Sequence, residues 1–437
     1  MTDALFFLDR RRFFVGAVSA FASSQLGCSK PEAVLEPIVA QRNDVPLRVL
    51  MVVEQEDGEQ EDKDAVVRGW GSVADQPLEI EMVSLDRSKC MELESVVLQS
   101  AKKADVLVYP LVLVGAASRS DAVIQMTTED LTQMDSQIGS LLASARNAAS
   151  RYGGDTYALP LGCTLPALIS SEVKVESPDS WQAYDRLVAD QWGGAAAEPT
   201  APGWAGMMFL WRLVGMDNWL FERENLDPLI NTQPYVKALD LMLRTHSRYT
   251  DKYRTPDQIW LAVSQGKLQG GIGFPRRRSG NQGQVQLASL PGVTDLSKVL
   301  LDPFSPVISL SASCRQTEAS KRFIQWFCGG EGSRTVRSQV AGMSDLRDDF
   351  SLGQDATAYD AWLADQLQAP LSLPCLQLDR AAEYLTVLDQ QVTKALRGEV
   401  ASQAALDAVA ARWGELTSEV GTESQLRAWR MAQGMPI

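Results

Sequence analysis

Residues 47–53 read LRVLMVV, a near-continuous apolar run that is typical of a strand buried on both faces. Two more strand candidates follow, the alternating segment LEIEMVSL (78–85) and the apolar segment DVLVYPLVLV (105–114). Between them, MELESVVLQSAKKA (91–104) has helical spacing. This alternation of strands and helices predicts an α/β domain with a largely parallel sheet.

Three side chains are candidate ligand contacts because of their place on these strands. Open α/β sheets bind ligands outside the carboxyl ends of their strands. Glu54 and Gln55 follow the first strand, and Tyr109 belongs to the third strand candidate. The alternative for Glu54 is a solvated acid in a charged loop.

The rest of the chain continues the alternation, without a repeat of fixed period. Helices are predicted at 179–190, 204–216, 234–249, 255–267, 319–340, 382–398 and 405–416, and short strands at 270–275 and 284–292. Asp-Ser begins the first of these helices and Thr-Pro begins the fourth, and both pairs are typical of helix N-termini.

Composition excludes several classes of function. The 437 residues are 45% hydrophobic and 22% charged, as in globular proteins of two or three domains, and the net charge of −14 argues against nucleic-acid binding. His246 is the single histidine, which excludes a multi-histidine zinc site, and the six cysteines are widely spaced. We therefore expect no metal and no cofactor.

The N-terminus has the features of an export signal. Residues 9–28 read DRRRFFVGAVSAFASSQLGC, in which three arginines precede an uncharged stretch too short to cross a hydrocarbon core of ~30 Å comfortably. The RRRFF string resembles a twin-arginine signal, and the LGC ending resembles a bacterial lipoprotein box with Cys28 as the lipidated residue. We expect a signal at 1–27 and a tether at 28–45; the alternative is cleavage elsewhere, with Cys28 incidental.

The order of motifs along the body resembles that of the extracellular solute-binding proteins of ABC importers, in particular the carbohydrate-binding family that includes maltose-binding protein. The matching segments are RYGGDTYALPLG (151–162), SPDSWQAYDRL (177–187), AVSQGKLQGGIGFP (262–275), LASLPG (287–292), ASKRFIQWFCGGEGSR (319–334) and LRGEVASQAALDAVAARW (396–413). The resemblance departs at CTLPALISS (163–171), which lacks a tyrosine–asparagine pair common in relatives, so the substrate does not transfer from the family.

The resemblance implies a two-lobe, periplasmic-binding-protein-like fold with hinge strands between the lobes. Lobe one would comprise 46–157 and 302–349, and lobe two 158–301 and 350–437. The implied function is capture of a carbohydrate or related polar solute and its delivery to an ABC permease, on the periplasmic or cell-surface side, with a lipid anchor at Cys28. The alternative is an anchored sensor or partner-binding domain of the same fold.

Further candidate contacts come from the residue types that suit such a cleft. Trp204, after a Gly-rich loop, could stack on a sugar ring, and so could Phe274 at the end of a strand. Thr164 could donate a hydrogen bond to a hydroxyl. Arg276, first of a basic triplet, could clamp a carboxylate, sulfate or phosphate, or lie in a solvated loop without a role.

An enzyme is not expected, because the common catalytic motifs are missing. The sequence holds no GxxxxGK[ST], GxSxG or HExxH. A glycosidase stays open, since its pair of carboxylates has no fixed spacing in sequence.

Overall fold

The computed structural model describes residues 44–54, 59–149, 151–171, 176–216, 219–277, 285–292, 298–329, 331–347, 357–368, 371–373 and 376–435. The predicted export signal, almost all of the predicted tether, Cys28 and Gln55 lie outside these residues. No helix in the described part of the chain is long and apolar enough to cross a membrane.

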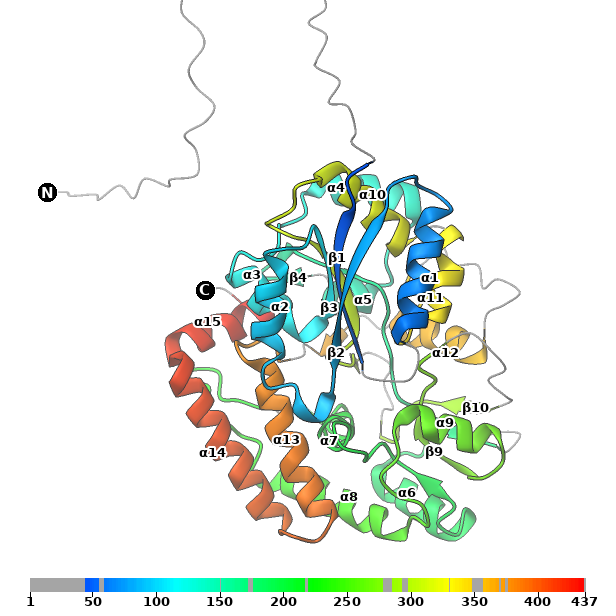
Figure 1. Ribbon diagram of the computed structural model, residues 1–437. Coiled ribbons are helices and arrows are strands. Elements are labelled where there is room, and N and C mark those ends of the chain that lie inside the picture. The colour runs from blue at the N-terminus through cyan, green and yellow to red at the C-terminus, as the bar shows by residue number, and fades with distance from the viewer. Residues whose placement is uncertain are drawn as a thin grey trace, which may run out of the picture. The chain divides into compact units, whose positions relative to one another are not determined.

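The first sheet has five strands in the order β2-β1-β3-β12-β6, of which the first three are seen in Figure 1. They are β1 (Leu47–Glu54), β2 (Leu78–Leu85), β3 (Val106–Pro110), β12 (Pro306–Leu310) and β6 (Leu159–Pro160). β1 pairs in parallel with β2 and β3, as the sequence predicted, and it is buried along nearly its whole length. β12 is antiparallel to β3, so the sheet is mixed rather than largely parallel.

The second sheet has the order β10-β7-β9-β8. Its strands are β7 (Ala167–Ser170), β8 (Ala196–Ala197), β9 (Gly270–Gly273) and β10 (Gln286–Ala288). β9 approaches β8 so closely that a Cβ on Gly271 would lie 2.4 Å from the carbonyl oxygen of Ala197. Glycine is therefore required there. Two small ladders join β4 (Arg151–Tyr152) to β5 (Asp155–Thr156) and β11 (Lys298–Leu300) to β13 (Leu371–Leu373).

Helices and short turns connect the strands. The segments before the middle of the chain are α1 (Glu59–Gly71), η1 (Arg87–Lys89), α2 (Leu93–Ala101), η2 (Leu111–Leu113), α3 (Val114–Arg119), α4 (Thr128–Ile138), α5 (Ala143–Ala149), α6 (Trp181–Arg186), η3 (Leu187–Gln191) and α7 (Ala205–Arg212). The later helices are α8 (Gln233–Arg248), α9 (Pro256–Ser264), α10 (Thr317–Cys328), α11 (Glu331–Gln339), α12 (Ala358–Leu367), α13 (Ala381–Leu396), α14 (Ser402–Val420) and α15 (Thr422–Ala432). Side by side in Figure 1 lie α1 with α11, and α13 with α14.

Two predicted helix starts are confirmed, and two predicted lengths are wrong. The Ser180 hydroxyl accepts from the backbone N–H of Ala183 at the start of α6, and Thr255 with Gln258 forms a capping box before α9. The strand predicted at 105–114 ends at Pro110, where a 3₁₀ turn begins. The helix predicted at 319–340 is two helices, because α10 ends at Cys328.

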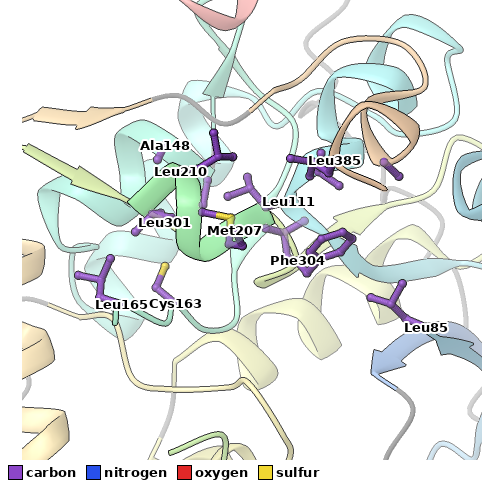
Figure 2. Packing of buried hydrophobic residues seen from close by; sticks show 14 of the residues in the cluster. Leu85, Leu111, Ala148, Cys163, Leu165, Met207, Leu210, Leu301, Phe304 and Leu385 are labelled. Atoms are coloured by element: carbon purple, nitrogen blue, oxygen red, sulfur yellow. The ribbon is translucent and has the colours of Figure 1, made fainter. Parts of the chain in front are cut away.

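α7 lies at the centre of the buried apolar residues. All of its residues are buried, and Figure 2 shows Met207 and Leu210 among side chains from distant segments, including Leu111 and Leu385. Its first turn rests on α13, where the Asp389 carboxylate accepts hydrogen bonds from the backbone N–H groups of residues 203 and 206 at 2.8 and 3.0 Å. This docking fixes the segment that carries Trp204.

Candidate functional site

The candidate site is a pocket at the edge where several strands end. Glu54 closes β1, Arg87 follows β2, and Phe274 and Arg276 follow β9. Because β12 is antiparallel to β3, the loop before it reaches the same edge and brings Asp302. The full lining is Val52, Val53, Glu54, Leu85, Arg87, Pro110, Thr164, Trp204, Phe274, Arg276, Asp302, Phe304, Ser305, Pro306, Val340, Ala341, Gly342 and Met343.

Five of the predicted ligand contacts line this one pocket. They are Glu54, Thr164, Trp204, Phe274 and Arg276.

Tyr109 does not line the pocket, and Gln55 lies outside the described residues. Tyr109 is fully buried in β3, where its hydroxyl lies 2.9 Å from the Ser309 hydroxyl across the sheet. Burial raises the pKa of Tyr109 well above its usual value, although the hydrogen bond with Ser309 opposes the shift. Its side chain therefore belongs to the core of the first sheet.

Arg87 fills the pocket and pairs with two acids. Its Nη1 donates to Asp302 Oδ1 at 2.9 Å and its Nη2 to Oδ2 at 2.5 Å, a bidentate pair. Its Nε donates to Glu54 Oε1 at 2.6 Å, and Nη2 also contacts that oxygen. The side chains of Arg87 and Asp302 are only 5% and 3% exposed, so these charges interact in a medium that screens them little.

The ionisation of the network follows from its geometry. Burial alone would raise the pKa of Glu54, but the charges of Arg276 and Arg87 outweigh burial and keep that pKa below its usual value. Burial would lower the pKa of Arg87, but Asp302 and Glu54 outweigh it and raise that pKa. Glu54 is therefore ionised and Arg87 is charged at neutral pH.

The aromatic side chains of the pocket are largely covered. The guanidinium carbon of Arg87 lies 3.7 Å from the centroid of the Trp204 ring and 4.6 Å from that of Phe304. Trp204 is 4% exposed and also meets Phe274 edge-on, with 5.8 Å between ring centroids. Sugar stacking on Trp204 would need a free ring face, and in this conformation Arg87 covers one.

Two arginines after β9 link the second sheet to β1 and α1. Arg276 Nη2 lies 2.8 Å from Glu54 Oε2, and its carbonyl accepts from the backbone N–H of Gly342 at 2.8 Å. Arg277 pairs with Asp62 of α1. Arg276 is buried, which excludes a solvated loop at that position, and Arg278 lies outside the described residues.

The pocket leaves little free space. Its cavity of about 30 Å³ has room for about two water molecules. A larger cavity, of about 270 Å³, lies near the start of α6, with Trp181, Arg212 and Lys237 in its lining. None of the predicted contact residues lines this larger cavity. We therefore take the first pocket as the candidate site and conclude that a sugar enters it only if side chains or sheets move.

Sequence reasoning missed Arg87, Asp302 and Phe304. Arg87 could have been predicted from the sequence, because it follows the carboxyl end of β2, and Glu54 was predicted from the same position at the end of β1. Asp302 and Phe304 carried no such signal, since β12 was not predicted. No group of three or more metal-ligating side chains occurs among the described residues, and the pocket offers charged and aromatic contacts.

Comparisons with known proteins were made by sequence and by structure. No protein-family model and no curated protein matches the chain. Maltose-bound T. maritima MalE3 matches with a TM-score of 0.66 and 16% identity, over 85% of this chain and 100% of that chain. An ABC transporter solute-binding protein from Agrobacterium radiobacter K84, in complex with ribitol, matches with a TM-score of 0.67 and 13% identity, over 85% and 98%.

A third structure extends the same likeness. The sugar-binding protein MalE of Xanthomonas citri matches with a TM-score of 0.65 and 13% identity, over 86% of this chain and 98% of that chain. Each of these likenesses covers at least 85% of this chain. The chain therefore has the periplasmic-binding-protein-like α/β fold of the solute-binding proteins of ABC transporters, as its sequence motifs predicted.

Proposed function

We propose that this chain is an exported solute-binding protein that captures a carbohydrate or related polar solute between two lobes and delivers it to an ABC permease. The observation that carries the proposal is the pocket itself. It lies where β1, β2 and β9 end, so residues of both sheets line it. Proteins with the same fold have been solved with maltose and with ribitol, which supports a polyhydroxylated solute.

The lobes and the anchor are parts of the same proposal. Lobe one would hold 46–157 and 302–349, and lobe two 158–301 and 350–437. Closure of the lobes would bury the solute between them. Export through the signal at 1–27 and lipidation of Cys28 would hold the protein at the outer side of a membrane, beside its permease.

The contacts with solute would come from the predicted residues that line the pocket. Glu54 and Arg276 would exchange their mutual ion pair for hydroxyl groups of the solute, which carboxylates and guanidinium groups bind well. Thr164 would donate one more hydrogen bond, and Trp204 and Phe274 would offer apolar contact once Arg87 has moved.

Thermal unfolding across a panel of neutral sugars, polyols, uronates, sugar phosphates, amino sugars, basic amino acids and guanidino compounds tests the proposal. A solute at about 100 times its Kd adds about 2.7 kcal/mol to the free energy of unfolding. We expect Thr164→Val to weaken binding of the solute that gives the shift by about fivefold, the loss of one hydrogen bond of about 1 kcal/mol. Thr393→Val is the matched control, because Thr393 is a buried threonine of α13 outside the pocket.

A sensor or partner-binding role is the second candidate, and one observation favours it. The pocket is already filled by Arg87 and its two acids, so this arrangement of side chains is held together without a solute. A folded protein that no member of the panel stabilises would overturn the transport proposal and favour this role.

A further inference from the structure

The pocket has the chemistry of a cation site, and Arg87 occupies it. Two aromatic rings, Trp204 and Phe304, meet the guanidinium group at 3.7 and 4.6 Å from their centroids. Ring faces attract cations because their π electrons carry partial negative charge. Around the edge of the same group, Asp302 and Glu54 accept its N–H donors. Aromatic ring faces combined with carboxylates around the edge bind a planar cation best.

The charge of the pocket depends on whether Arg87 is in it. The charged residues of the lining are Glu54, Asp302, Arg87 and Arg276, which balance to zero. Without the guanidinium group of Arg87, the remaining three leave one net negative charge in a buried site. An incoming cation restores the balance, whereas a neutral solute leaves a buried carboxylate without its partner, which is strongly unfavourable.

The free volume of the pocket also indicates that a solute has to displace Arg87. The free cavity of about 30 Å³ admits about two water molecules beside Arg87. A larger solute therefore has to displace the Arg87 side chain. Arg87 belongs to the short turn η1 after β2, and the side chain of Lys89 in the same turn is 82% exposed, so this turn lies at the protein surface.

From these contacts we infer that Arg87 is a built-in occupant of the pocket, and that the solute which displaces it carries a guanidinium or ammonium group. This inference rests on the proposed function, because it takes the pocket as the solute site. It narrows the solute class from polar solutes in general to cationic ones, such as a basic amino acid, a guanidino compound or an amino sugar.

Chemical rescue of Arg87→Ala tests the cation site. The variant loses the guanidinium group, and methylguanidinium chloride at concentrations far below denaturing ones can replace it. We expect methylguanidinium at ten times its Kd to raise the Tm of the variant by about 2 °C. Methylurea, its neutral isostere, and sodium chloride at equal ionic strength should have no effect, and the wild type should respond less than the variant.

A matched variant controls for general effects of the probe. Arg48→Ala removes another arginine that pairs with a buried carboxylate, Asp105, and among the described residues no aromatic ring lies over that guanidinium group. Its Tm should not respond selectively to methylguanidinium. Where Arg87→Ala fails to fold, Arg87→Gln keeps most of the side-chain bulk, and refolding yield with methylguanidinium against methylurea gives the same comparison. Equal responses to both probes would overturn the cation site.

The wild-type protein then tests the solute class. We expect arginine, agmatine or glucosamine to raise its Tm, and Glu54→Gln/Asp302→Asn to abolish that shift. A shift with glucose or ribitol alone would overturn the cationic class while supporting the proposed function. No shift with any solute, neutral or cationic, would overturn both.

Discussion

Glu54 joins the two arginines of the pocket, so replacing it with glutamine tests how strongly the network holds the structure. The carboxylate accepts from Arg87 Nε at 2.6 Å and lies 2.8 Å from Arg276 Nη2, and its side chain is 12% exposed. In Glu54→Gln the side chain keeps its size and shape but loses the charge. The amide offers one carbonyl oxygen where the carboxylate offers two.

The expected loss in the free energy of unfolding follows from the buried arginine charge that the substitution leaves without its partner. Removing one partner from a buried ion pair costs about 3–5 kcal/mol, because the other charge stays buried without compensation. Arg87 keeps its bidentate contact with Asp302, so we expect the lower end of that range. For a folded body of this length, a loss of about 3 kcal/mol lowers Tm by about 4 °C.

The pH dependence has a definite sign. The arginines keep the folded-state pKa of Glu54 below its unfolded value, so its contribution to stability is present above the unfolded pKa and is lost as pH falls through the folded one. The wild type should exceed Glu54→Gln in stability at pH 7. The two should begin to converge as pH falls below about 4.3, the ordinary pKa of glutamate, and should be equal only below the lower folded-state pKa.

Urea unfolding followed by circular dichroism at several pH values measures both effects. Glu79→Gln is the matched control, since Glu79 lies on β2, is exposed and changes the net charge equally. A loss at Glu54 no larger than at Glu79, or a difference that does not shrink in acid, would refute the reasoning from the ion pairs.

Three further predictions concern the core and the anchor. Arg212 and Glu198 form an ion pair in which the side chains are 1% and 0% exposed, so Arg212→Met should lower the free energy of unfolding by about 3–5 kcal/mol. The double variant Arg212→Met/Glu198→Leu removes both charges, so its free energy of unfolding in urea should lie within about 2 kcal/mol of the wild-type value. Gly206→Ala places a Cβ 2.7 Å from a backbone nitrogen of α13 and should cost about 1–3 kcal/mol, whereas Gly414→Ala, with open space around it, should stabilise by about 0.5–1 kcal/mol. Cys28→Ala should move the exported protein from the membrane to the soluble fraction on cell fractionation, and an unchanged distribution would contradict lipidation there.

The strands of the first sheet differ in how well sequence predicts them. β1 and β2 were predicted to within one residue, because a continuous apolar run and a clean alternation are strong local signals. β12 reads PVISL, only five residues of which the first is a proline, and it was missed. Its partner β3 lies about 200 residues away, and no local pattern identifies so distant a neighbour.

The candidate contact residues also divide into those with a local sequence signal and those without one. Glu54 and Arg276 were found because each follows a strand that the sequence predicted. Asp302 was not found, since it precedes β12. Tyr109 was predicted on the correct strand, but its hydroxyl meets Ser309 inside the sheet, and the sequence alone does not say which face a fully apolar strand turns to the pocket.

The ion pairs that close the pocket also limit how tightly any solute can bind. A solute larger than two waters meets the protein only after Arg87 leaves Asp302 and Glu54, and Arg276 links Glu54 to the second sheet. If the open arrangement lies about 1.4 kcal/mol above the closed one, the apparent Kd is about tenfold weaker than the intrinsic Kd. A cation recovers the contacts that Arg87 gives up, so it bears less of this cost than a neutral sugar. If the proposed cation site is correct, charge rather than the area of aromatic surface is therefore the property by which this pocket would select its solute.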